Sequence, residues 1–114
     1  METTLFILEN PFKDENLSDE DYLCWQCVLL EGVLAKFPQQ LSSLNVKRVG
    51  FSRPRVDVIA QVGGANQSLP TLVLGEGILE GQETGSFEGR RFIKGKDEIL
   101  AALNQIYNIP HVHP

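Results

Sequence analysis

Two cysteines separated by two residues are the strongest chemical feature of this sequence. Cys24 and Cys27 are its only cysteines, and they stand in the segment CWQC directly before an apolar run. Thiols at this spacing can form a disulfide with each other, serve as half of a metal site, or pack as small apolar side chains. The spacing leaves all three possibilities open, so the surrounding elements have to narrow them.

A helix is predicted to begin at the cysteine pair. Apolar residues recur at helical spacing along it, and further apolar residues widen the stripe: Cys27, Val28, Leu29, Leu30, Val33, Leu34 and Phe37. A helix that is apolar on most of its surface is expected to be largely buried. Pro38 is predicted to end it.

The other segments predict strands and two further helices. Strands are indicated by TLFIL (Thr4–Leu8), VKRVGF (46–51), TLVLG (71–75) and RRFIKG (90–95). A short helix is predicted between Ser52 and Gly63, with Pro54 in its first turn, and an amphipathic helix is predicted near the end of the chain from Ile99, Leu100, Leu103, Ile106 and Tyr107. The segment before Cys24 reads as an acidic loop, and residues 76–89 as a glycine-rich connection that is long for a hairpin and expected to be mobile.

The order of these elements predicts an α/β fold. Strands separated by helices imply parallel pairing through right-handed crossovers, whereas the last two strands, joined without a helix, are expected to be antiparallel. A mixed four-stranded sheet with helices on both faces follows, and residues 1–114 fit a single domain.

Composition limits the classes of partner. The chain is 42% apolar and has a net charge of −5, which argues against a nucleic-acid partner held by phosphate neutralisation. Its N-terminus has no basic segment typical of a signal peptide, and no apolar run approaches the roughly 20 residues of a membrane span. We therefore expect a cytoplasmic protein with no membrane partner. In the cytoplasm, cysteine pairs are more often redox or metal thiols than structural disulfides. The oligomeric state is not predicted.

The element order resembles the thioredoxin fold, and two local features agree. CWQC stands at the start of the first helix, and QSLPT places Pro70 at the mouth of the third strand. The chain is similar to the thioredoxin-like superfamily, and most of all to a little-characterised family of short bacterial thioredoxin-like proteins of unknown function. The matching stretches are YLCWQCVLLEGVLAKFP, VKRVGFSRPR, ANQSLPTLVL and PHVHP. The resemblance implies a cis Leu69–Pro70 bond that faces the cysteine pair.

Position along the helix predicts a role for each cysteine. Free N–H groups and the helix dipole favour a thiolate at Cys24, whereas Cys27 lies one turn deeper and is suited to resolve a mixed disulfide. The predicted function is thiol–disulfide exchange, without a cofactor, on an unidentified protein or small-thiol substrate. Trp25, Leu69 and Pro70 are the predicted substrate-binding residues. Four acidic residues of the preceding loop would oppose the thiolate if they were near it in space: Glu15, Asp19, Glu20 and Asp21.

Three alternatives remain for the same region. The long loop before Cys24, the unusual WQ pair and the lack of a matching buried acid favour a binding module that kept the fold and lost the chemistry. Zinc binding by the cysteines with His111 and His113 is disfavoured, because the histidines follow a helix expected to lead away from the pair. No metal is therefore expected.

The third alternative is glutathione. The segment Gly95–Asp97 has the outline of the turn that holds glutathione in glutaredoxins, although Asp97 is also an ordinary helix N-cap residue. Separately, Arg53 and Arg55 flank Pro54 near the same predicted edge of the sheet, and we interpret them as a solvated charge pair in preference to an anion site.

Overall fold

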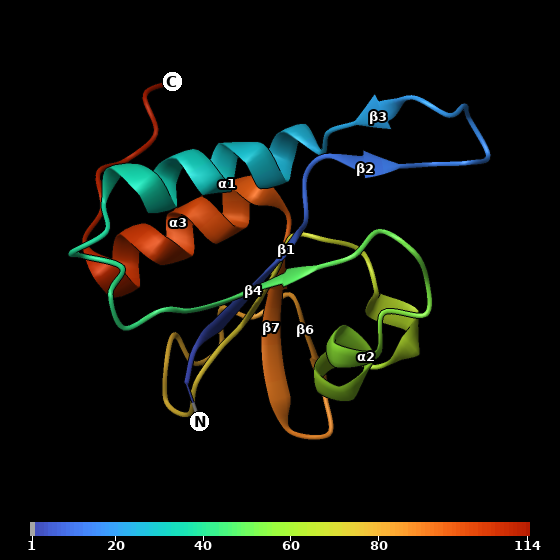
Figure 1. The fold of residues 1–114 in the computed structure, drawn as a ribbon. Helices are drawn as coiled ribbons and strands as arrows, with labels where there is room; N and C mark the ends of the chain where they lie inside the picture. Colours follow the sequence, from blue (N-terminus) through green and yellow to red (C-terminus); the bar gives the residue numbers. More distant parts are fainter. Residues whose placement is uncertain (1) are drawn as a thin grey trace.

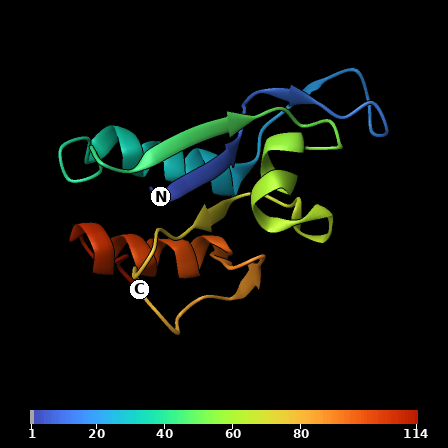
Figure 2. The ribbon, with the colours of Figure 1, turned by 90° about the horizontal axis from the view of Figure 1, so that it is seen from below.

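A mixed five-stranded sheet forms the centre of the protein. The computed structural model describes residues 2–114. The strands lie in the order β4 (Asn45–Val49), β1 (Thr4–Leu8), β5 (Thr71–Val73), β7 (Arg90–Lys94) and β6 (Gly85–Phe87). Only β1 and β4 are parallel, and the other neighbouring pairs are antiparallel. Figure 2 shows this order, from β4 (green) through β1 (blue) to the orange strands.

Helices cover both faces of the sheet, as predicted. Helices α1 (Trp25–Lys36) and α3 (Lys96–Tyr107) lie together on one face, and α2 (Val56–Val62) lies on the other (Figure 1). A single 3-10 turn, η1 (Gly64–Asn66), follows α2. None of the helices in residues 2–114 combines the length and the apolar composition needed to cross a membrane.

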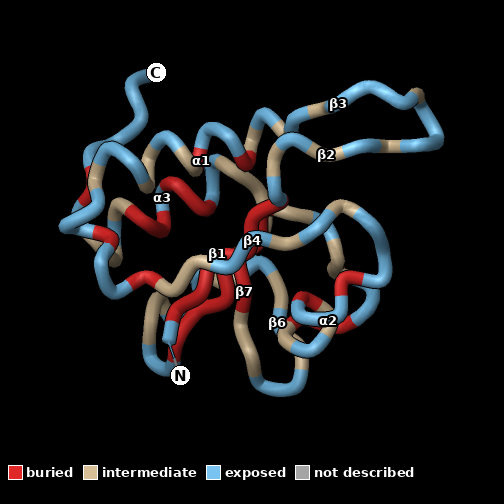
Figure 3. Tube along the Cα trace, in the orientation of Figure 1, coloured by how far each residue is buried: buried red, intermediate tan, exposed pale blue. Residues whose placement is uncertain are grey.

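Strand β1 is buried along its whole length (Figure 3). Leu5 and Ile7 pack into the cluster beneath α1 and α3, whereas Phe6, between them, packs into the cluster beneath α2. Successive side chains of a strand point to opposite faces, so a strand covered on both faces needs apolar residues at every position. Leu5, Phe6, Ile7 and Leu8 meet that need, and Thr4 at the start of the strand donates its hydroxyl to the carbonyl of Glu2. The predicted bounds of this strand are confirmed.

The predicted count of four strands is wrong. The glycine-rich connection contains a fifth strand, β6, which pairs with β7. The acidic loop before Cys24 contains a small separate hairpin, β2 (Phe12–Lys13) with β3 (Asp21–Tyr22), which projects beyond the first turn of α1 in Figure 1. Segments of two or three residues are too short to show an alternation of apolar and polar residues. They become extended because they pair with a neighbouring strand.

The direction of β5 also differs from the prediction. Parallel pairing holds for β1 and β4, but β5 runs antiparallel to β1. A five-residue strand such as β4 is roughly 17 Å long, whereas the seven residues of α2 span about 10 Å. The connection does not return along β4: β4 ends at Val49, opposite Leu8, and β5 begins at Thr71, opposite Phe6, so β5 starts near the same edge and runs in the reverse direction.

Helix α1 is buried along one stripe only. Cys27 and Leu30 are buried, whereas Trp25 is 60% exposed and Val28 and Leu29 are each 41% exposed. The expectation of a largely buried helix is therefore wrong. The sheet covers one side of α1, and no element within residues 2–114 covers the side that carries Val28 and Leu29.

Two helix starts differ from the sequence prediction by a few residues. Helix α2 begins at Val56 with Arg55 as its cap residue, so Pro54 precedes the helix and does not enter its first turn. Helix α3 is capped by Gly95, and Asp97 lies inside its first turn. A carboxylate in the first turn favours the helix through the dipole without serving as the cap.

Replacing Gly85 by alanine should destabilise the protein by about 1–3 kcal/mol. A Cβ atom at this position would lie 2.6 Å from Cζ of Phe92, whose side chain is buried against α2. Urea denaturation of Gly85→Ala measures the loss. Gly50→Ala is the matched control, because a Cβ there meets nothing within 4 Å and its φ is ordinary. Equal free energies of unfolding for the two variants would show that β6 does not pack as described.

Candidate functional site

Cys24 caps the N-terminus of α1. Its backbone is extended, with φ −88° and ψ 106°, and its Sγ accepts a hydrogen bond from the backbone N–H of Cys27 at 3.3 Å. Its own N–H donates to Oδ1 of Asn10 at 2.6 Å. The side chain is half-buried. Cys24 therefore lies at the helix terminus, where free N–H groups favour a negative charge.

Cys27 lies one turn deeper and is fully buried. Its Sγ accepts a hydrogen bond from the N–H of Leu8, at the end of β1, at 3.3 Å. Burial raises the pKa of the Cys27 thiol to about 12, against an opposing effect of the Leu8 N–H. The neighbouring Cys24 and the charge of Glu31 add to the increase in this pKa. Cys27 is therefore a neutral thiol at physiological pH.

The two thiols differ in accessibility. Both are free, and a hydrogen bond joins Sγ of Cys24 to the backbone of Cys27. An accessible thiol at a helix start can attack a disulfide in solution, and a second thiol one turn inside can displace the product of that attack. This geometry is compatible with the predicted roles of the pair.

The predicted substrate-binding residues fall into two groups. Trp25 is exposed beside Cys24, and Nζ of Lys96 lies 5.1 Å from the centroid of its ring. Leu69 is half-buried and packs against the same cluster as Cys24, while Pro70 is buried directly before β5. The Leu69–Pro70 peptide bond is cis, as predicted.

The segment after β4 provides an aromatic and cationic wall. The ring of Phe51 stacks on Phe12 at 4.6 Å, and the guanidinium of Arg55 lies 5.6 Å from the Phe51 centroid. Arg55 is only 6% exposed and donates hydrogen bonds to the carbonyls of Phe51 and Gln67. The interpretation of Arg53 and Arg55 as a solvated pair is therefore correct for the exposed Arg53 and wrong for Arg55.

Burial is the main cause that lowers the pKa of Arg55, and the neighbouring charge of Arg53 acts in the same direction. Phe51, whose ring lies beneath this guanidinium, packs against the same core cluster as Cys24 and Cys27. The site thus includes a buried cation that the spacing of the cysteines did not reveal.

Two further contacts of the site were also missed. Asn10 holds the N–H of Cys24, and Leu8 supplies the N–H that reaches Cys27. The turn signal ENP after the first strand marked Asn10 as a turn residue. Its partner could not be identified, because the contact depends on how the following hairpin returns the chain to α1.

In the part of the chain that the structure describes, the residues considered for zinc and for glutathione do not gather around a metal site. Within residues 2–114 no three His, Cys, Asp or Glu side chains form a group that could hold a metal ion, so the cysteines and the two histidines are not assembled into one site. His111 instead lines a shallow surface hollow beside α3 with Leu100 and Asn104. The expectation that the protein binds no zinc stays a prediction. In the segment considered for glutathione, Lys96 pairs with Asp97 at 3.0 Å.

The chain belongs to the DUF3088 family, which is described as a protein of unknown function, and the family model matches residues 2–111. No curated protein and no solved structure matches the sequence. Family membership therefore assigns no activity, and the geometry of the site has to supply the argument.

The buried Cys27 thiol should make the folded protein less stable at alkaline pH. In the unfolded chain a cysteine titrates near pH 8.5–9, whereas burial raises the pKa of Cys27 to about 12 in the folded protein. Between these values the unfolded state loses a proton that the folded state keeps, so stability falls by up to about 1.4 kcal/mol per pH unit. At pH values well below about 8.5 this contribution is fully present.

Denaturation of the wild type and Cys27→Ala under reducing conditions, at pH 8 and pH 10, measures this effect. The stability difference between the two proteins should narrow by roughly 1–2 kcal/mol at the higher pH. Leu30→Ala truncates a neighbouring buried side chain but keeps Cys27, so its difference from the wild type should not change with pH. A constant difference for Cys27→Ala would contradict the prediction.

Proposed function

We propose that this member of the DUF3088 family performs thiol–disulfide exchange, with Cys24 as the attacking thiol and Cys27 as the resolving thiol. The observation that carries the proposal is the asymmetry of the pair. Cys24 is half-buried and caps α1, whereas Cys27 is fully buried one turn further along the same helix. An exposed thiol at a helix terminus is the more reactive of two such groups.

The reaction needs only a disulfide substrate as oxidant. The Cys24 thiolate attacks one sulfur of the substrate, a mixed disulfide forms, and the other substrate sulfur leaves as a thiolate. Cys27 then gives up its proton and attacks Sγ of Cys24, which breaks the mixed disulfide and releases the second substrate thiolate. The substrate is reduced to two thiols, and the protein is oxidised to a Cys24–Cys27 disulfide. In the other direction the same steps oxidise a dithiol substrate.

The high pKa of Cys27 makes the second step the demanding one. Burial is its main cause, and the Cys24 thiol adds to it through a hydrogen bond and charge. When Cys24 is joined to a substrate it no longer carries a charge that opposes ionisation of Cys27. Resolution thus becomes easier once the mixed disulfide has formed.

The fold supports the same proposal. The elements β1, α1, β4, α2, β5, β7 and α3 follow each other in the order of the thioredoxin fold, with β6 and the β2–β3 hairpin as additions. The cysteine pair stands at the start of the first helix, and Pro70 stands directly before β5. We therefore include a thioredoxin-like fold in the proposal.

A binding module without redox activity is the second candidate. The exposed apolar residues around the start of α1 favour it: Leu23, Trp25, Val28 and Leu29. Large apolar side chains that remain uncovered are typical of contact surfaces. In that case Cys27 serves only as a packed side chain of the core.

Alkylation of single-cysteine variants separates the two candidates. In Cys27→Ser the remaining Cys24 should react with iodoacetamide at pH 8 at least roughly tenfold faster than Cys27 does in Cys24→Ser. A thiol with a pKa of about 12 is ionised in only about one molecule in 10⁴ at that pH. The serine in Cys27→Ser can still accept the N–H of Leu8, which preserves the contact with β1.

Equilibration of the wild type in buffers of defined dithiothreitol ratio provides the second measurement. Reversible formation of one intramolecular disulfide, lost in both single variants, supports exchange chemistry. If the wild type forms no such disulfide, or if Cys24 reacts no faster than Cys27, the binding module is the better description.

A further inference from the structure

Three cations lie close together around residues 66–68, and none of them has an acidic partner within residues 2–114. Burial is the main cause that lowers the pKa of Lys94, and the charges of Arg53 and Arg55 lower it further. Burial also lowers the pKa of Arg55, and the charge of Arg53 adds to that effect. Such a cluster is unexpected in a chain with a net charge of −5, since buried cations are normally paired with carboxylates.

Hydrogen bonds fix two of the cations in place. Nζ of Lys94 donates to the carbonyls of Asn66 and Ser68 and to the Ser68 hydroxyl, so its three donors are used. The Arg55 guanidinium donates three bonds to the carbonyls of Phe51 and Gln67. A guanidinium has five N–H donors, so two remain on Arg55. Carbonyl oxygens satisfy the donors of these groups without neutralising their charge.

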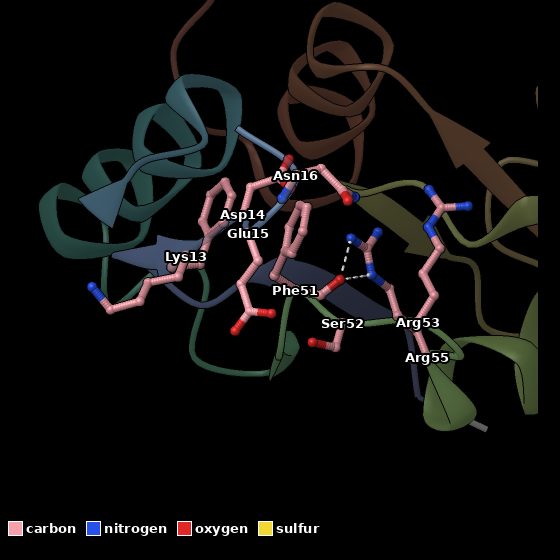
Figure 4. A pocket seen from close by; sticks show the side chains of 9 residues that line it. Lys13, Asp14, Glu15, Asn16, Phe51, Ser52, Arg53 and Arg55 are labelled. Carbon is pink, nitrogen blue, oxygen red and sulfur yellow. Dashed lines mark hydrogen bonds between the residues drawn. The ribbon is translucent and has the colours of Figure 1, made fainter. Parts of the chain in front are cut away.

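The arginines line an open cavity of about 770 Å³ between the β2–β3 hairpin and the segment that follows β4. Figure 4 shows the guanidinium groups of Arg53 and Arg55 directed to the same side, with the Phe51 ring beside Arg55. Asp14 and Glu15 also line the cavity, but the Glu15 carboxylate points away from both arginines, on the other side of Phe51. The β2–β3 hairpin thus forms one side of the cavity, and the segment with Arg53 and Arg55 forms the other.

We propose that this cavity is a binding site for a small oxyanion, a carboxylate or phosphate group, which Arg53 and the free donors of Arg55 hold. Guanidinium groups present planar pairs of donors that match both kinds of oxyanion. Lys94 contributes its charge and not a contact, because its donors are already used. The proposal is independent of thiol–disulfide exchange, since it rests on the arginines and not on the cysteines.

Titration of ¹⁵N-labelled protein with inorganic phosphate, and separately with succinate, tests the proposal at constant ionic strength. Saturable shifts should appear at the Nε–H signals of Arg53 and Arg55 and at the backbone amides of Phe51, Ser52, Arg53 and Arg55. Stronger binding of phosphate or of succinate identifies which oxyanion the site prefers. Arg53→Gln should weaken binding roughly tenfold, the effect of losing one charge-assisted contact. Arg53 is exposed and takes part in no ion pair within residues 2–114, so this variant is expected to keep the fold.

Arg90→Gln is the matched control. It removes the same charge from the opposite end of β7, away from Lys94, and should change the affinity by less than about twofold. Two results would overturn the proposal: no saturable shift with either anion, or equal weakening by Arg53→Gln and Arg90→Gln, which indicates diffuse attraction. Neither result would affect the alkylation rates of Cys24 and Cys27, so the two proposals fail separately.

Discussion

The end of β1 determines where the cysteine pair lies. Leu8, the last residue of this central strand, donates its N–H to Sγ of Cys27 and accepts a hydrogen bond at its carbonyl from Asn10, at 2.9 Å. Asn10 in turn accepts the N–H of Cys24. These bonds connect the strand to the first turn of α1, so the buried strand positions both thiols. The local structure of the site therefore depends on the burial of β1 on both of its faces.

The sequence predicted the parts of the fold in which one segment carries its own signal. The run TLFIL predicted β1 with its observed bounds, because a strand covered on both faces has a nearly continuous apolar sequence. Strand β6 and the β2–β3 hairpin were missed, since they depend on pairing with a neighbour. The burial of α1 was overestimated, because the apolar composition of a helix does not show whether another element covers each of its sides.

The site follows the same division. Its cysteines could be placed at a helix start from their spacing and from the residues that follow them, and Cys24 is the cap residue of α1. Arg55 could not be placed, because an arginine in a polar segment normally stays in solvent. Its burial results from the return of residues 66–68 beside the segment after β4, where the Gln67 carbonyl receives its N–H. Contacts of this kind are properties of the tertiary structure.

The cation cluster depends on tertiary structure in the same way. The Arg55 guanidinium donates to the carbonyls of Phe51 and Gln67, and Lys94 donates to those of Asn66 and Ser68, so residues 66–68 hold both side chains. Phe51 also packs against the core cluster that contains Cys27 and on which Cys24 lies. The segment after β4 therefore contacts both the proposed anion site and the core beneath the cysteine pair, and a substitution at Phe51 would disturb both.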